Sequence, residues 1–286
     1  MSEPLADEQV PHCYRHPDRE TYVSCTRCGR HACPDCMRSA SVGQQCVDCI
    51  REGSKSTRAA RTAFGGRPAA GAVVTWTIVA INVVMFLIAT GDPNILNNLV
   101  MWGGGVAAEG QWYRLLTSAF VTPGAGFSGL GFLDILFNLW ALVFVGPALE
   151  NLLGHSRFLG LYLLSALGGS VFYYWIAAPS AAAAGASGAI FGLFGAWFVV
   201  SKRLRLDTRG IIILIAINLA FSFIYRSTIA WQDHIGGLVT GALITAAFVY
   251  APRKNRTAIQ IGAAVVVLAI LVLATALRSH QILTSV

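Results

Sequence analysis

The chain has 286 residues, of which 55% are apolar and only 12% are charged. A soluble globular domain is typically about a quarter charged, so this composition excludes an ordinary soluble enzyme. The charges are also uneven, because residues 1–70 hold 10 of the 21 Lys and Arg and 8 of the 14 Asp and Glu. This pattern is typical of a multi-pass membrane protein behind a small soluble domain. The net charge of +7 needs no nucleic-acid partner to explain it, and none is expected.

All seven cysteines lie between Cys13 and Cys49, and most fall into pairs separated by two residues. Two intervening residues form a tight knuckle that points both ligands at one metal ion. A histidine completes the set of eight ligands, which is enough for two closed zinc sites. The four pairs are Cys13 with His16, Cys25 with Cys28, Cys33 with Cys36, and Cys46 with Cys49.

A disulfide framework is the alternative to zinc, but an odd number of cysteines favours metal. About 40 residues bury too small a core to fold alone, so metal binding would supply much of the folding free energy. The spacing resembles B-box-like cross-brace zinc modules. That resemblance implies that the first and third pairs share one ion and the second and fourth pairs the other. We therefore expect residues 1–50 to form a zinc-stabilised module that recruits a cytoplasmic protein partner.

The remainder of the chain is organised around apolar segments. Residues 51–71 are a basic linker, and no cleavable signal peptide is expected before it. Seven segments then approach the 20 or so residues that cross a membrane as a helix, the fourth and fifth being the shortest. We predict an all-α polytopic membrane protein with a six-span core over 72–252 and a seventh span with a tail over 253–286. The segments cover about 73–90, 132–150, 158–178, 186–201, 211–225, 233–251 and 259–277.

Basic residues gather on alternate connections between these segments. A cytoplasmic N-terminus places the linker, residues 202–209 and residues 253–256 inside, whereas the outside connections hold only Arg114 and Arg226. This bias predicts a protein of the cell membrane with its N-terminus in the cytoplasm and its C-terminus outside. Thiols stay reduced in the cytoplasm, which agrees with a zinc module there. The first outside loop, about residues 91–131, is rich in aromatic residues and is expected to lie in the membrane interface.

Ser187 and His234 are candidate partners. Ser187 opens the fourth apolar segment among small residues, which by themselves are commonly packing residues. His234 opens the sixth; a histidine in a span indicates function unless a backbone carbonyl satisfies it. Both segments run from outside to inside, so the two side chains are expected at similar depth. A hydroxyl beside an imidazole forms a nucleophile with its general base.

Two further features support this pairing. Small residues spaced by four, at Gly188 and Gly192 and again at Gly237 and Gly241, allow the two helices to touch. Asn138 is a buried amide in the second apolar segment, where it could donate to a developing oxyanion or form an interhelical hydrogen bond.

Through these residues, the chain resembles the rhomboid family of intramembrane serine proteases over most of residues 73–251. The resemblance implies a rhomboid-like six-helix core and a membrane-embedded endopeptidase that cleaves transmembrane segments of other proteins. Ser187 would be the nucleophile, His234 the base of a dyad and Asn138 an oxyanion donor, with no cofactor in the chemistry. The matching pieces are Gly185-x-Ser187-Gly188, His234-x-x-Gly237-x-x-x-Gly241, Leu136-Phe137-Asn138, Trp112-Tyr113-Arg114-Leu115 and Glu150-x-x-x-Gly154. Arg114 and Glu150 would be structural.

The sequence departs from the family at two positions. Asp134 stands where the family usually has His, and an ionised carboxylate would repel an oxyanion. Two unit charges 4 Å apart repel by about 4 kcal/mol at an effective dielectric of about 20, or roughly three decades in rate. Activity then requires that Asp134 is protonated, turned away or bonded to a donor such as His234. Phe191 replaces a frequent Tyr but keeps a ring to pack against His234.

Two alternatives follow from the same residues. Asp134 favours a proteolytically inactive rhomboid-like protein that binds membrane clients. Ionisable residues within spans, namely Asp134, Glu150 and His234, are also found in channels and transporters, although no repeated half is evident. The seventh segment shows no polar anchor in its sequence.

Overall fold

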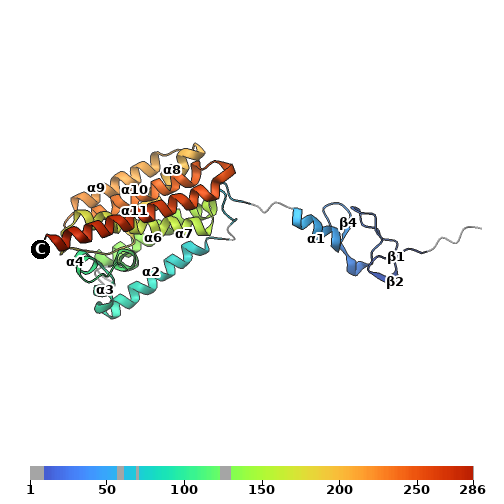
Figure 1. Cartoon of the computed structure of the whole chain (residues 1–286), viewed down its shortest axis with the longest axis horizontal. Helices are drawn as coiled ribbons and strands as arrows, with labels where there is room; N and C mark the ends of the chain where they lie inside the picture. Colours follow the sequence, from blue (N-terminus) through green and yellow to red (C-terminus); the bar gives the residue numbers. More distant parts are fainter. Residues whose placement is uncertain (1–9, 57–60, 69–70, 123–129, 286) are drawn as a thin grey trace, which may run out of the picture. The chain divides into compact units, whose positions relative to one another are not determined.

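The computed structural model describes residues 10–56, 61–68, 71–122 and 130–285. The chain divides into two compact units, Met1–Ala60 and Arg61–Val286. The first unit contains the predicted zinc module and the second contains every long apolar helix (Figure 1).

The N-terminal unit is built from two short hairpins and one helix. β1 (His12–Cys13) pairs antiparallel with β2 (His16–Glu20), and β3 (Met37–Ser39) pairs antiparallel with β4 (Gln44–Cys46). The 3-10 turn η1 (Pro34–Cys36) precedes β3, and α1 (Val47–Ser56) ends the unit, so part of the predicted linker is helical. Its buried apolar cluster consists of six cysteines with only Ala32 and Met37. An ordinary hydrophobic core is therefore lacking among the described residues of this unit, as its short length predicted.

Helices form at all seven predicted apolar segments. Among the described residues, five helices are long and apolar enough to cross a membrane, and α8 and α9 are the two shortest of the seven, as predicted. The seven helices are α2 (Val73–Gly91), α6 (Leu130–Leu153), α7 (His155–Ile176), α8 (Ser187–Leu204), α9 (Arg209–Ile224), α10 (Trp231–Tyr250) and α11 (Arg256–Thr284).

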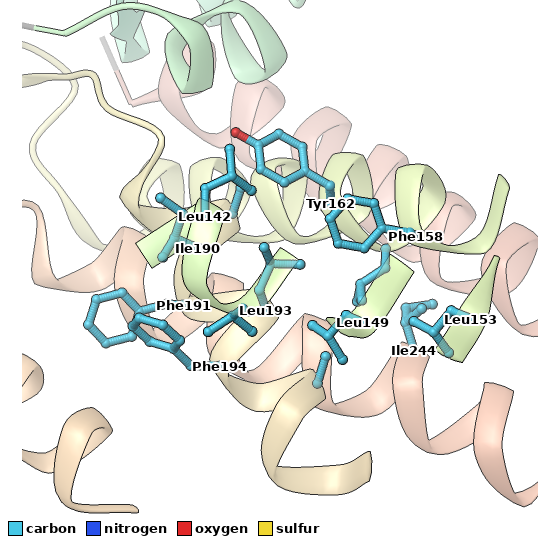
Figure 2. Close-up of a cluster of buried hydrophobic side chains, with 14 of the residues drawn as sticks. Leu142, Leu149, Leu153, Phe158, Tyr162, Ile190, Phe191, Leu193, Phe194 and Ile244 are labelled. Carbon is cyan, nitrogen blue, oxygen red and sulfur yellow. The ribbon is translucent and has the colours of Figure 1, made fainter. Parts of the chain in front are cut away.

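The core of this unit lies where α6, α7, α8 and α10 meet. Figure 2 shows Phe158 and Tyr162 of α7 among Leu149, Leu193 and Ile244, and all five side chains are fully buried. The outer surface is apolar as well. Large side chains such as Phe144 of α6 (70% exposed), Ile224 of α9 (73%) and Ile261 of α11 (60%) lie on it. A surface of this kind is stable in a lipid bilayer, so the unit is a multi-pass membrane domain.

Glycines bring α8 and α10 into backbone contact. A methyl group on Gly237 would collide with the carbonyl oxygen of Gly188, and one on Gly241 would collide with that of Gly192. The prediction that small residues let these two helices touch is therefore confirmed. Close backbone approach fixes the relative height of the two helix beginnings, which carry Ser187 and His234.

The connection between α2 and α6 folds into short elements. They are α3 (Pro93–Leu99), β5 (Met101–Trp102), α4 (Gly103–Ala108), α5 (Arg114–Thr117) and η2 (Ser118–Phe120). Buried Arg114 holds them together, because its Nη1 donates to the carbonyl oxygens of Asn97 at 2.8 Å and Val100 at 2.9 Å. β5 also pairs antiparallel with β6 (Ala182–Ala183), which ties this connection to the segment that leads into Ser187. Phe127, one of the predicted interfacial aromatics, lies outside the described residues.

Glu150 fixes the beginning of α2, as expected of a structural residue. Its fully buried carboxylate accepts hydrogen bonds from the backbone N–H groups of Val74 and Thr75, both at 2.8 Å, and contacts His155 Nδ1. The first N–H groups of a helix have no partner within the helix, so the carboxylate satisfies two of them.

The expectation that the seventh span lacks polar anchors is wrong. Gln260 of α11 is buried; its amide donates to the carbonyl oxygens of Phe64 and Phe248, and its Oε1 accepts from Arg157 at 2.7 Å. Farther along α11, Ser279 Oγ lies 2.9 Å from the Tyr174 hydroxyl. These side chains look isolated in the apolar sequence for two reasons. Their side-chain partners, Arg157 and Tyr174, lie about a hundred residues away, and the partners at Phe64 and Phe248 are backbone carbonyl groups.

Candidate active site and metal centres

Ser187 and His234 meet at the beginnings of α8 and α10. Ser187 is the first residue of α8, and His234 lies in the first turn of α10. His234 Nε2 lies 2.8 Å from Ser187 Oγ, within hydrogen-bond distance, and His234 is only 6% exposed. The sequence-predicted pair is therefore brought into the geometry that a nucleophile and its general base require.

The imidazole of His234 is held on its face by Phe191. The two rings are stacked, with centroids 4.3 Å apart and planes 10° from parallel. Phe191 lies one helical turn after Ser187, so α8 supplies both the hydroxyl and the ring against which the imidazole packs. The expected role of this aromatic side chain in packing is confirmed.

Ser222 is a contact of the imidazole that the sequence analysis missed. Its Oγ lies 2.7 Å from His234 Nδ1, on the opposite edge of the ring from Ser187. Ser222 belongs to α9, where it also donates to the backbone carbonyl of Asn218 at 2.7 Å. The signal was present in the sequence, since Asn218 and Ser222 are polar residues spaced by one turn in an otherwise apolar segment.

Asp134 of α6 lies near Ser187, and Asn138 of the same helix contacts Asp134. Asn138 Nδ2 donates to Asp134 Oδ1 at 3.1 Å. A methyl group on Gly185 would lie 3.5 Å from Ser187 Oγ and 3.6 Å from Asp134 Oδ2, so the carboxylate and the nucleophile flank the same glycine. Asp134 is thus bonded to a donor, but the donor is Asn138. The amide nitrogen carries a second hydrogen that this contact does not use.

Gly185 shapes the approach to Ser187. Its φ of 136° lies in a region that other residues rarely adopt, and its N–H donates to the Ser118 carbonyl at 2.9 Å. The chain then turns into α8, whose N-cap residue Ala186 provides no side-chain hydrogen bond. The backbone N–H of Ser187 lies at this helix start, where the helix itself supplies no acceptor, and can donate to a developing negative charge.

Asp233 points away from the dyad, as its position next to His234 on a helix predicts. Its carboxylate lies between Gly169 of α7 and Gly188 of α8, where a methyl group added to either glycine would collide with it. Gly188, which follows Ser187, and Asp233, which precedes His234, are therefore in contact as well. A second link of this kind keeps the two helix beginnings aligned.

The eight predicted metal ligands form two groups of four. Within each group the ligand atoms lie within 4.8 Å of one another. One group combines the first and third pairs, Cys13, His16, Cys33 and Cys36; the other combines the second and fourth, Cys25, Cys28, Cys46 and Cys49. All seven cysteines are free thiols, so the disulfide alternative is not supported.

The spacing and surroundings of these atoms fit zinc. A tetrahedral ion with Zn–S bonds of about 2.3 Å separates its ligands by about 3.8 Å. Cys28 Sγ and Cys46 Sγ are 3.8 Å apart, as are Cys13 Sγ and His16 Nδ1. The Cys46 backbone N–H donates to Cys25 Sγ at 3.2 Å and lowers the pKa of that thiol to about 6, which favours the thiolate that binds metal. Arg30 donates to Cys28 Sγ at 3.4 Å and offsets the negative charge of four thiolates.

Comparison with known proteins agrees with this arrangement. Residues 109–251 match the Rhomboid domain family. The chain is 34% identical over 209 residues to the rhomboid protease GluP of Bacillus subtilis. The aligned region covers 69% of this chain and 39% of that protein. It is also 34% identical over 195 residues to the putative rhomboid protease YdcA of the same organism, covering 64% of this chain and 91% of that protein. The rhomboid protease AarA of Providencia stuartii is 25% identical over 221 residues.

The fold and these matches define a polytopic membrane protein of the rhomboid type. The chain belongs to the rhomboid family. The matched family region contains Asn138, Ser187 and His234 and ends before α11, and it does not include the N-terminal cysteine-rich unit.

Proposed function

We propose that this protein is a serine endopeptidase that cleaves transmembrane segments of other membrane proteins with a Ser187–His234 dyad. The 2.8 Å contact between Ser187 Oγ and His234 Nε2 carries the proposal. The relatives named as rhomboid proteases support an intramembrane protease.

The geometry suggests a role for each group. Ser187 Oγ attacks the scissile carbonyl carbon while His234 Nε2 takes its proton, and the same nitrogen then donates that proton to the leaving amine. A water molecule that loses its proton to His234 then hydrolyses the acyl-enzyme. The oxyanion accepts hydrogen bonds from the Ser187 backbone N–H and from the second amide hydrogen of Asn138. A substrate helix has to unwind at the cut, because its carbonyl groups are otherwise hydrogen-bonded.

Fluorophosphonate labelling tests this assignment. We expect the purified full-length protein in lipid vesicles to form a covalent adduct at Ser187 and to cleave a test transmembrane substrate. Both activities should disappear in Ser187→Ala, because the methyl group has no nucleophilic oxygen. The matched control is Ser201→Ala, which should behave like the native protein. Ser201 is a buried serine on α8 whose hydroxyl has no hydrogen-bond partner among the described residues. An adduct that persists in Ser187→Ala would contradict the assignment.

Asp134 supports a second candidate function, that of an inactive rhomboid-like protein that binds membrane clients. Its carboxylate lies beside Gly185 and engages Asn138, the expected oxyanion donor. Absence of both labelling and cleavage over a broad pH range, with client helices still captured, would favour this function over proteolysis.

We further propose that residues 10–56 hold two structural zinc ions, one in each group of four ligands, and that this unit recruits a cytoplasmic protein partner. The distribution of Lys and Arg supports an N-terminus in the cytoplasm and a C-terminus outside. Protease accessibility of tags at the two ends, in intact cells, tests this orientation; an N-terminal tag cleaved from outside would contradict it.

Removal of zinc is expected to unfold the N-terminal unit without affecting the dyad. Its buried cluster is mostly cysteine, and structural zinc contributes roughly 10–16 kcal/mol to such folds. Chelation should abolish hydrogen-exchange protection in residues 10–56 while fluorophosphonate labelling of Ser187 stays unchanged. Protection that survives after the metal content has fallen to zero would show that the unit folds without zinc.

A further inference from the structure

A continuous hydrogen-bonded chain runs through His234. Ser187 Oγ lies 2.8 Å from Nε2, and Ser222 Oγ lies 2.7 Å from Nδ1 on the other edge of the ring. The chain continues from Ser222 Oγ to the backbone carbonyl oxygen of Asn218, also at 2.7 Å. It therefore joins α8, α10 and α9.

The end of this chain determines where its hydrogens lie. The Asn218 carbonyl can only accept, so it takes the single hydroxyl hydrogen of Ser222. Ser222 Oγ then meets His234 Nδ1 as an acceptor, and both contacts are satisfied only when Nδ1 carries the imidazole hydrogen. In the other tautomer two lone pairs would face each other across 2.7 Å, or the Asn218 contact would have to break.

We propose that Ser222 is a positioning residue that selects the Nδ1–H tautomer of His234. In that tautomer Nε2 presents a lone pair to the Ser187 hydroxyl, as a general base must. The consequence for the rate rests on the proposed protease function, whereas the tautomer itself does not. Ser222 would act through His234 and does not touch the reacting atoms.

The burial of α9 supports a specific role for this hydroxyl. Only Ile211 and Ser222 are buried along the described residues of α9, and Ser222 is 2% exposed. A serine or threonine bonded to the carbonyl four residues earlier is ordinary in helices, as Thr275 with Leu271 shows in α11. Ser222 differs from Thr275 in that its oxygen also meets an imidazole. The only buried hydroxyl of α9 thus lies where the histidine needs an acceptor.

The tautomer can be measured directly. Solid-state NMR of the full-length protein in lipid vesicles, with isotope-labelled histidine, distinguishes a protonated Nδ1 from a protonated Nε2. The His234 signals are identified by their loss in His234→Gln. We expect Nδ1–H in the native protein and in Ser222→Thr, which keeps a hydroxyl, and a mixture of tautomers in Ser222→Ala.

The rate of fluorophosphonate labelling provides the second measurement. Ser222→Ala leaves the buried Nδ1 without a partner, so labelling should slow by about tenfold or more, while Ser222→Thr recovers most of it. Ser201→Ala, the matched buried serine, should alter neither tautomer nor rate. An Nε2–H tautomer in the native protein, or an unchanged His234 spectrum in Ser222→Ala, would overturn the inference. A tautomer that follows Ser222 in a protein that never reacts with the probe would refute only the protease function.

Discussion

Replacing Asp134 with His is expected to increase the rate of substrate cleavage at neutral pH, by up to about three decades. The native carboxylate flanks Gly185 together with Ser187 Oγ, so its negative charge opposes the charge that develops on the oxyanion. A neutral imidazole at the same place would remove that repulsion and add a donor. The measurement is kcat/KM for a transmembrane test substrate in lipid vesicles.

The variant Asp134→Asn separates these two contributions. It removes the charge but keeps a group of the same size beside Asn138, whose amide now donates to Asp134 Oδ1. We expect Asp134→Asn to give most of the increase in kcat/KM and Asp134→His to give a somewhat larger increase. Cleavage that is unchanged or slower in both variants would show that the native carboxylate does not limit the reaction.

Substituting Gly237 with Ala should both destabilise the membrane domain and slow catalysis. The added methyl group would collide with the Gly188 carbonyl oxygen, which belongs to the backbone and cannot rotate away. Overpacking of this kind costs about 1–3 kcal/mol. Because Gly188 directly follows Ser187, separation of α8 and α10 would also lengthen the 2.8 Å contact with His234. The midpoint temperature of thermal unfolding in detergent and the labelling rate of Ser187 should both decrease.

Gly160→Ala is the matched control for that change. Gly160 lies within α7, and among the described residues a methyl group there would meet no atom within 4 Å beyond its own turn of helix. Alanine at such a site typically stabilises a helix by about 0.4–1 kcal/mol. Equal losses of thermal stability and labelling rate in the two variants would indicate that the domain is generally sensitive to alanine. That result would contradict a specific role for the contact between α8 and α10.

Much of this architecture could be predicted because it is encoded locally. Apolar segments long enough to span a bilayer mark the helices, and glycines spaced by four mark the close contact of α8 with α10. The knuckle spacing of the cysteines predicted the candidate metal ligands, and the resemblance to cross-brace modules predicted the two groups that they form. Ser187 and His234 stood out because polar groups are costly in a membrane and both open spans on the same side.

The missed features depend on distant partners. Ser222 looks like a minor polar residue until α9 is placed against His234. Likewise, Asn138 was expected to face an oxyanion, but its contact with Asp134 depends on side-chain rotamers that spacing alone does not determine. Helical periodicity shows that Asp134 and Asn138 share a face, and no more than that.

The amide of Gln260 joins the last helix to the rest of the membrane domain. One side chain bridges Arg157, the Phe64 carbonyl and the Phe248 carbonyl, all of which belong to the earlier part of the chain. Deleting α11 would remove the hydrogen-bond partner of a guanidinium and of two carbonyl groups. The final helix is therefore an integral part of the helical bundle, and a shortened protein that ends at Ala251 is expected to be less stable than the full-length protein.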